Sequence, residues 1–165
     1  MTVRTTLKFS DTTDVPMQLN VLQAIRLRVD YRVPISHAVQ LSNYAWVNTD
    51  LLKPEIDPKT RRGHYLNLGL MQLPRDSETR TVLARMNACN LQPAGLRELL
   101  AFTPYFDEEP LSPIVALGST FEDSIGQRSA VCLYGNSAEK YLGLNSLQHG
   151  WNRRHRFLVI LPLIE

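Results

Sequence analysis

Residues 25–33 read IRLRVDYRV, and their strict alternation restricts the fold more than any other stretch of the chain. Apolar side chains occupy every odd position of this stretch, and charged side chains occupy every even position. A period of two over nine residues predicts a β-strand with one face on a core and the other facing water or a partner. Pro34 cannot donate a ladder hydrogen bond, so we expect the strand to end near Val33. The basic side chains of the outer face are Arg26, Arg28 and Arg32.

Helical signals follow this strand. Ser36 is a candidate N-cap for a helix that runs to about Val47, with Ile35, Val39 and Trp46 pointing inward. The stretch KPEIDPKTRRG, residues 53–63, is rich in proline and charge and predicts an exposed loop. HYLNLGLMQL, residues 64–73, is typical of a further strand.

Residues 76–103 predict two short helices joined as a hairpin. Asp76 or Ser77 is the expected N-cap of the first helix, and Pro93 is suited to the first position of the second. The first helix has a stripe of apolar residues at core-facing spacing, and the second has a leucine-rich face. These residues are Val82, Met86 and Cys89 in the first helix and Leu96, Leu99 and Leu100 in the second.

After these helices the character of the sequence changes. TPYFDEEPLSP, residues 103–113, carries three prolines and an acidic triplet and is typical of a hinge. Four short apolar segments follow it, separated by glycine-containing or polar turns, and they predict an antiparallel β-meander. The expected fold class is therefore α+β. We expect a single compact domain over 1–165, with 1–103, 104–112 and 113–165 as an alternative subdivision, because the last part alone can barely support its own core.

The last stretch, HGWNRRHRFLVILPLIE, raises the main functional question. FLVILPLI shows no alternation, so it is expected to form either a strand covered on both faces or a strand whose Pro162 lies at a sheet edge. The preceding loop leads into this strand. That loop offers the guanidinium groups of Arg153, Arg154 and Arg156 beside the ring of Trp151. Cations that neutralise phosphates next to an aromatic face are what single-stranded nucleic acid binding needs.

A second basic loop contains Lys59, Arg61, Arg62 and His64 and would join this surface if the fold brings the loops together. The alternative is that the arginines are only solvated, or that they pair with the acidic segment 107–109. In that case Trp151 would plug the end of the sheet.

Catalytic and metal signatures are scarce. The sequence contains no GxxxxGK[ST], GxGxxG, GxSxG or HExxH pattern, and His149 and His155 could share a metal only with a third ligand from elsewhere. One nucleophilic arrangement remains open, in which Cys132 acts with His149 or His155 as base and Asp123 orients the base. Cys132 lies in the middle of an apolar segment, where burial would raise its pKa and make it inert. We therefore expect no enzyme activity, no metal and no cofactor.

The compartment follows from cysteine usage and hydropathy. Cys89 and Cys132 are isolated thiols with no CxxC spacing, and no stretch approaches 18 uninterrupted apolar residues. The first residues lack the apolar run of a signal peptide. We expect a cytoplasmic protein without a membrane partner.

Three functional hypotheses remain. The leading hypothesis is a small non-catalytic protein that binds nucleic acid or another polyanion through the basic strand face and the Trp151–Arg156 loop. The second is a structural or accessory protein that acts by protein–protein contact or homo-oligomerisation, through the apolar strands 64–73 and 157–164. The third is a hydrolase-type enzyme that uses Cys132. The net charge of +2 is too small to decide between them.

Overall fold

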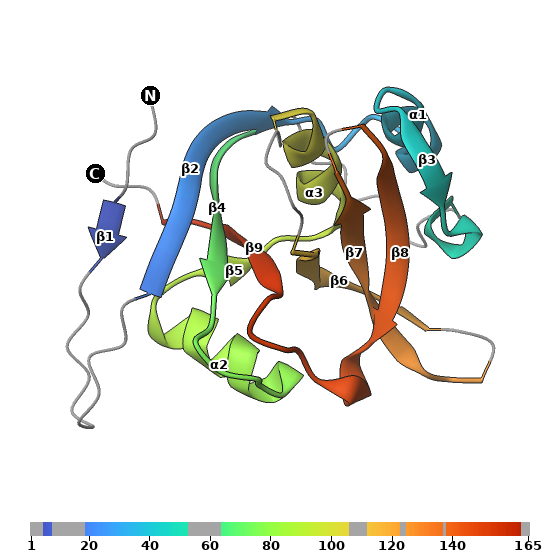
Figure 1. Cartoon of the computed structure of the whole chain (residues 1–165). Helices are drawn as coiled ribbons and strands as arrows, with labels where there is room; N and C mark the ends of the chain where they lie inside the picture. Colours follow the sequence, from blue (N-terminus) through green and yellow to red (C-terminus); the bar gives the residue numbers. More distant parts are fainter. Residues whose placement is uncertain are drawn as a thin grey trace, which may run out of the picture.

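The structure is a computed structural model. It describes residues 5–7, 19–52, 64–105, 112–122, 125–136 and 138–162, with the backbone alone for 5–7 and 19–23. Within these residues the fold is mixed α/β, with three α-helices against a mostly antiparallel sheet (Figure 1). The strands are β1 (Thr5–Leu7), β2 (Leu19–Val29), β3 (Tyr44–Val47), β4 (His64–Gln72), β5 (Gln92–Pro93), β6 (Ile114–Glu122), β7 (Arg128–Gly135), β8 (Lys140–Ser146) and β9 (Arg156–Ile160). The helices are α1 (Ile35–Gln40), α2 (Thr79–Ala88) and α3 (Leu96–Phe102), with short 3-10 turns η1 (Thr49–Leu52), η2 (Thr103–Tyr105) and η3 (Leu147–His149).

The last strand of the chain lies in the middle of the sheet. The strand order is β1-β2-β4-β9-β6-β7-β8-β3, and β5 pairs separately with β9. β9 runs antiparallel to β4 and parallel to β6, and its residues Phe157, Leu158 and Val159 are buried. The prediction of a central strand covered on both faces is therefore confirmed for residues 157–160, while Leu161 and Pro162 follow the end of β9 and residues 163–164 lie outside the described residues.

Successive residues of the central strands enter two separate hydrophobic clusters. Leu70 and Leu158 belong to one cluster, while Met71, Phe157 and Val159 belong to the other. Since neighbouring side chains of a strand point to opposite faces, the clusters cover opposite faces of the sheet. The apolar side chains of α3 pack in the first cluster, and those of α2 pack in the second.

This arrangement separates the two helices that were expected to form a hairpin. The apolar stripes of both helices are buried as predicted, but they face different clusters. Between the helices, Gln92 and Pro93 form β5 and pair with β9, so Pro93 is not the first residue of α3. The hairpin is not confirmed, because the sheet lies between the helices. α2 begins at Thr79 with Glu78 as its N-cap, later than the predicted Asp76 or Ser77.

Two predicted boundaries near the start of the chain are wrong. β2 ends at Val29, because the Asp30 side chain accepts the backbone N–H of Arg32 at 3.0 Å and closes a local turn. The helix expected to reach Val47 ends at Gln40. The following YAWV segment instead forms β3 and pairs parallel with β8, so tertiary pairing outweighs the weak helical signal there. The predicted strand at 64–73 is confirmed as β4.

The four-strand meander is not confirmed. β6, β7 and β8 pair antiparallel in sequence order, but β9 leaves this order and inserts between β6 and β4. A strand that is apolar on both faces is most stable where both faces are covered, and that position is the centre of the sheet. β4 and β9 come from either side of the predicted hinge, most of which lies outside the described residues. The single-domain organisation stays a prediction.

Candidate binding surfaces

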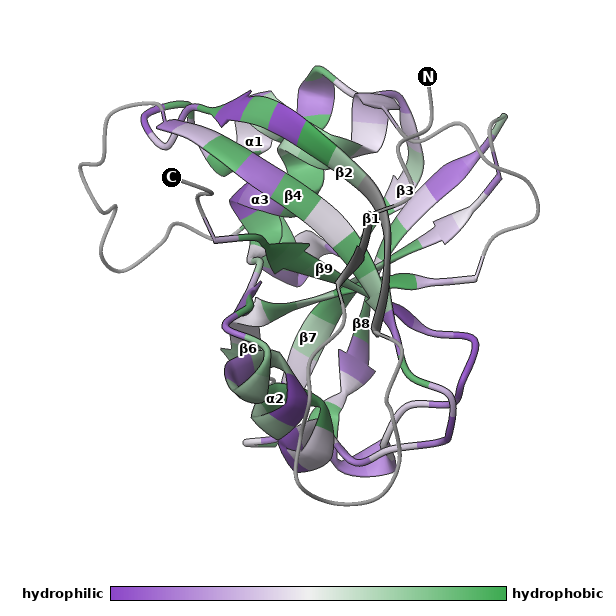
Figure 2. Ribbon diagram, turned by 90° about the vertical axis from the view of Figure 1, so that its left-hand side faces the viewer, coloured by the Kyte–Doolittle hydropathy of each residue, from purple (hydrophilic) through white to green (hydrophobic). Residues whose placement is uncertain are grey.

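The outer face of β2 keeps its arginines in solvent. Arg26 and Arg28 are exposed, while Leu27 between them and Val29 after them are buried. The alternation seen in the sequence is therefore realised over this part of the strand, and β2 and β4 run side by side with alternating polar and apolar bands (Figure 2). On β4, Asn67 pairs with Arg26 and Tyr65 pairs with Arg28.

An exposed aromatic ring lies directly against this basic face. The guanidinium carbon of Arg26 is 5.5 Å from the ring centroid of Tyr65, which is a cation–π distance. The Tyr65 side chain is 61% exposed, so much of its surface is open to solvent. Arg26, Arg28 and Tyr65 are called the strand surface below. It joins two positive charges to one accessible aromatic ring on the stretch where β2 and β4 pair without a register shift, from Ile25 to Val29 of β2.

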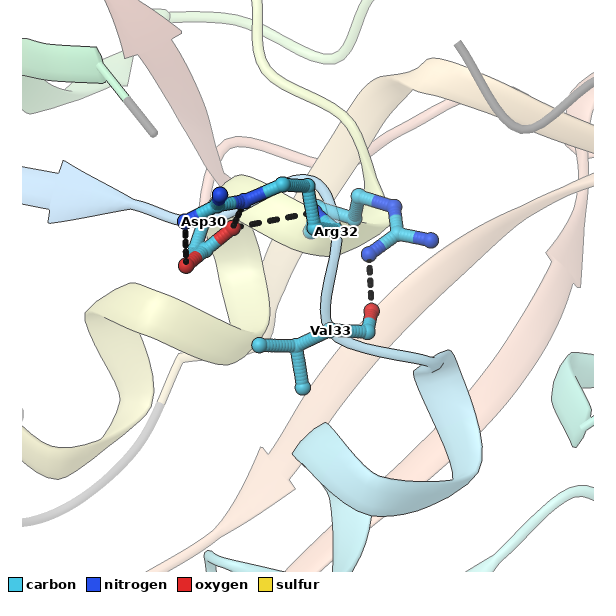
Figure 3. Close-up of polar contacts among 4 residues, drawn as sticks. Asp30, Arg32 and Val33 are labelled. Carbon is cyan, nitrogen blue, oxygen red and sulfur yellow. Dashed lines mark hydrogen bonds and ion pairs between the residues drawn. The ribbon is translucent and has the colours of Figure 1, made fainter. Parts of the chain in front are cut away.

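Arg32 does not belong to the strand surface. It follows the end of β2, and its guanidinium makes two contacts of 3.3 Å with the Asp30 carboxylate (Figure 3). The hydrogen bond from Arg32 lowers the pKa of Asp30, so this carboxylate stays charged and balances the arginine. The carbonyl of neighbouring Val33 accepts a hydrogen bond from Arg97 of α3, which fixes the turn against the helix (Figure 3).

The second basic loop is only partly visible. Lys59, Arg61 and Arg62 lie outside the described residues, so their predicted role in a polyanion surface stays a prediction. His64 is described: it is exposed, begins β4 and pairs with Val29. In the sequence, Arg61 and Arg62 come shortly before Tyr65.

Trp151 lies in the core, where it has no open face for a base. Only 3% of the residue is exposed, and its indole N–H donates to Thr79 Oγ1 at 2.9 Å. Its ring packs edge-on against Phe157 at 5.9 Å and against His155 at 5.2 Å between ring centroids. The interpretation of Trp151 as a stacking platform in solvent is therefore corrected, because the ring fills the second cluster.

Arg156 is also buried, because it is the first residue of the central strand. Its guanidinium donates to the carbonyl of Ser112 at 2.9 Å, and its backbone N–H donates to the carbonyl of Pro113 at 2.9 Å. Arg153 and Arg154 remain exposed in the turn before β9. Of the four residues proposed from this loop, two are therefore in solvent.

The strand surface and the exposed turn lie near opposite ends of β4. Arg26 pairs with Asn67, whereas the carbonyl of Arg153 accepts a hydrogen bond from Gln72, at the last position of β4. The five residue-to-residue steps from Asn67 to Gln72 span roughly 17 Å of extended strand. The structure thus divides the predicted polyanion surface into two separate basic regions.

The candidate nucleophile has no access to solvent. Cys132 is fully buried in the second cluster, and burial raises the pKa of its thiol to about 12. His149 is exposed on η3, and His155 contacts Trp151 and the backbone of Asn152. Nucleophilic catalysis needs an accessible thiolate beside a base, and this geometry does not favour it. Within the described ranges, no cluster of three His, Cys, Asp or Glu side chains is arranged for a metal ion.

Two exposed aromatic residues were missed as site residues from the sequence. Tyr65 lies on the face of β4 opposite to Leu66, Leu68 and Leu70, so the alternation of that strand carried the signal. Trp46 was expected to point inward from a helix, but it is 54% exposed on β3. Its exposure could not be found without knowing that the YAWV segment forms the strand at the end of the sheet order of the described residues.

Comparisons with protein families, curated proteins and solved structures find no match for this chain. None of the helices in the described part of the chain has the length and apolar composition needed to cross a membrane.

Proposed function

We propose that this chain is a non-catalytic binding protein for single-stranded nucleic acid, and that the strand surface of Arg26, Arg28 and Tyr65 is its contact. The observation that carries the proposal is the exposed Tyr65 ring beside two solvent-facing arginines on paired strands β2 and β4. A base stacks on the aromatic ring, and the guanidinium groups neutralise the adjoining phosphates.

Single strands fit this surface better than duplexes. Bases in a duplex are stacked on one another, so an isolated aromatic ring on a strand reaches none of them. The bases of a single strand are free to stack on the Tyr65 ring. Because every base has a π-face, the contact is expected to be tolerant of sequence.

The test is fluorescence anisotropy with a labelled oligothymidylate of about fifteen nucleotides, within the range of known site sizes. The wild-type chain is compared with the double variant Arg26→Ala/Arg28→Ala at several salt concentrations. Loss of two phosphate contacts should weaken binding about tenfold or more and make the slope of log affinity against log salt less negative by about 1.4.

The control variant is Arg85→Ala/Arg128→Ala, which removes the same charge from exposed positions on α2 and β7. It is expected to bind nearly as the wild type does. If the two double variants weaken binding equally, net charge alone explains the interaction. If the wild type does not bind at low salt, the proposal is wrong.

A second candidate function is contact with a protein partner at the β3 end of the sheet. The strands first proposed for this role, β4 and β9, are paired on both sides and offer no free edge. β3 ends the strand order of the described residues and carries no charged residue, and exposed Leu41, Trp46 and Leu52 lie on it or beside it in sequence. Light scattering at high protein concentration tests self-association; loss of a dimer in Trp46→Ala would favour this candidate.

We also propose a cytoplasmic location, because the two cysteines are free thiols in the interior. Buried reduced thiols fit a reducing compartment. Fractionation of the cells that express the chain tests this directly.

A further inference from the structure

The turn before β9 is held rigidly, and its two central side chains face solvent. The turn runs from Asn152 to His155, whose backbone N–H donates to the Asn152 carbonyl at 3.1 Å. The Asn152 side chain also accepts the N–H of Arg154 at 2.9 Å. Arg153 and Arg154 therefore occupy the two central positions of a closed turn.

This turn is attached to the start of α2 by several hydrogen bonds. Ser77 and Trp151 donate to each other's carbonyls at 2.8 Å, and Asp76 accepts the backbone N–H of Arg153 at 3.0 Å. Gly150 allows this approach because its φ of +68° lies in the left-handed region. The polypeptide that carries the two arginines is thus fixed in place before any ligand arrives.

Two further arginines are exposed on the segment that the turn contacts. Arg75 precedes Asp76, and Arg80 lies in the first turn of α2. Together with Arg153 and Arg154 they give four positive charges, and Asp76 and Glu78 offset two of them. Among the described residues, no ion pair is formed by these four guanidinium groups. The region therefore keeps a local excess of two positive charges. In the described part of the chain the exposed aromatic rings, Trp46, Tyr65 and Tyr105, lie on other elements, so its contacts are with phosphates alone.

We infer that Arg153 and Arg154, supported by Arg75 and Arg80, form a second contact for the phosphate backbone of the same nucleic acid strand. This inference rests on the proposed function of the strand surface. The two contacts are separated by roughly 17 Å along β4. A stacked strand carries one phosphate per about 3.4 Å, so about five nucleotides cover this separation. A strand longer than this reaches both contacts, and the second contact then forms within one complex at a high effective concentration.

The test compares the wild type with Arg153→Ala/Arg154→Ala on oligothymidylates of about fifteen and about four nucleotides. On the longer strand the variant should bind about tenfold more weakly, with a salt slope less negative by about 1.4. On the short strand, which reaches one contact, the variant should lose clearly less affinity than on the longer strand. The charge-matched control is again Arg85→Ala/Arg128→Ala.

The outcomes separate the inference from the proposal beneath it. If the longer strand binds the wild type and Arg26→Ala/Arg28→Ala weakens it, the strand surface stands. If Arg153→Ala/Arg154→Ala then binds the longer strand with the same affinity as the control variant, the inference of a second contact is wrong. If the wild type binds neither strand, both are wrong. Circular dichroism and the melting temperature check that the variant is folded. We expect it to fold, because in the described structure Arg153 and Arg154 make hydrogen bonds through their backbone atoms and not through their side chains.

Discussion

Trp151 and Thr79 are joined by a hydrogen bond of 2.9 Å from the indole N–H to the threonine hydroxyl oxygen. The same hydroxyl donates to the carbonyl of Leu147 at 2.8 Å. The first residue of α2 thus contacts two points, Leu147 and Trp151, within the connection between β8 and β9. The large ring of Trp151 stabilises the protein at the point where the basic turn begins, and its role is structural.

Replacement of Trp151 should therefore reduce stability. Trp151→Ala removes a buried ring and is expected to lower the free energy of unfolding by about 3–5 kcal/mol. Trp151→Phe keeps most of the apolar contacts but loses the hydrogen bond to Thr79, so it should cost less. Urea denaturation followed by circular dichroism measures both. An unchanged midpoint for Trp151→Ala would mean that the ring is not in the core.

Stability should also fall at alkaline pH because of Cys132. The pKa of its thiol rises from 9.0 to about 12 on burial, so between pH 9 and 12 the unfolded chain loses a proton that the folded chain keeps. The contribution of the buried Cys132 thiol to the free energy of unfolding is complete below pH 9 and disappears as the pH rises toward 12. Within this window the free energy of unfolding should drop by about 1.4 kcal/mol per pH unit from this group.

The matched variant for this measurement is Cys132→Ala. It should flatten the alkaline part of the stability curve, although the half-buried Tyr134, whose pKa is also raised by burial, contributes in the same direction. If the free energy of unfolding depended on pH identically in the variant and the wild type, the pKa of the Cys132 thiol would not be raised in the folded protein.

The reactivity of the same thiol bears on the enzyme hypothesis. With a pKa of about 12, only about one Cys132 in ten thousand is a thiolate at pH 8. Alkylation by iodoacetamide, mapped by mass spectrometry, should be slow in the native protein and fast in denaturant. Rapid modification of native Cys132 would reopen nucleophilic catalysis.

Gly118 and Gly143 should respond differently to alanine. A Cβ on Gly118 would lie 2.5 Å from the carbonyl oxygen of Pro93, which is backbone, so Gly118→Ala should cost about 1–3 kcal/mol. A Cβ on Gly143 would lie 3.2 Å from the ring of Tyr134, which can shift, so Gly143→Ala should cost less. Thermal melts of the two variants give the comparison. A reversed order would indicate that the backbone at Pro93 and Ala94 shifts more easily than the ring of Tyr134.

Local periodicity predicted much of the architecture. The alternation in IRLRVDYRV identified β2 and its exposed arginines, and the unbroken apolar run at the end of the chain identified a central strand. Both patterns reflect whether successive side chains face a core or water. Such a pattern can be recognised within one short segment of the sequence.

Long-range pairing could not be predicted in this way. The segment YAWV became β3 because β8 lies beside it, and Trp46 is exposed for the same reason. The composition of the last loop suggested one basic aromatic site. Its Trp151 is buried because the start of α2 packs against the loop, and that contact joins residues distant in the sequence. The pairing of Tyr65 with the basic face of β2 likewise depends on the register between β2 and β4, which the sequence alone does not determine.

The most direct test of the central proposal is photocross-linking of an iodouracil-substituted single strand to the wild-type chain, followed by mass spectrometry of the peptides. If a base stacks on the exposed ring beside Arg26 and Arg28, the cross-linked nucleotide is found on Tyr65, and the product is lost in Tyr65→Ala. A cross-link to Trp46 instead of Tyr65, or no cross-link at low salt, would contradict the assignment of the strand surface as the nucleic acid contact.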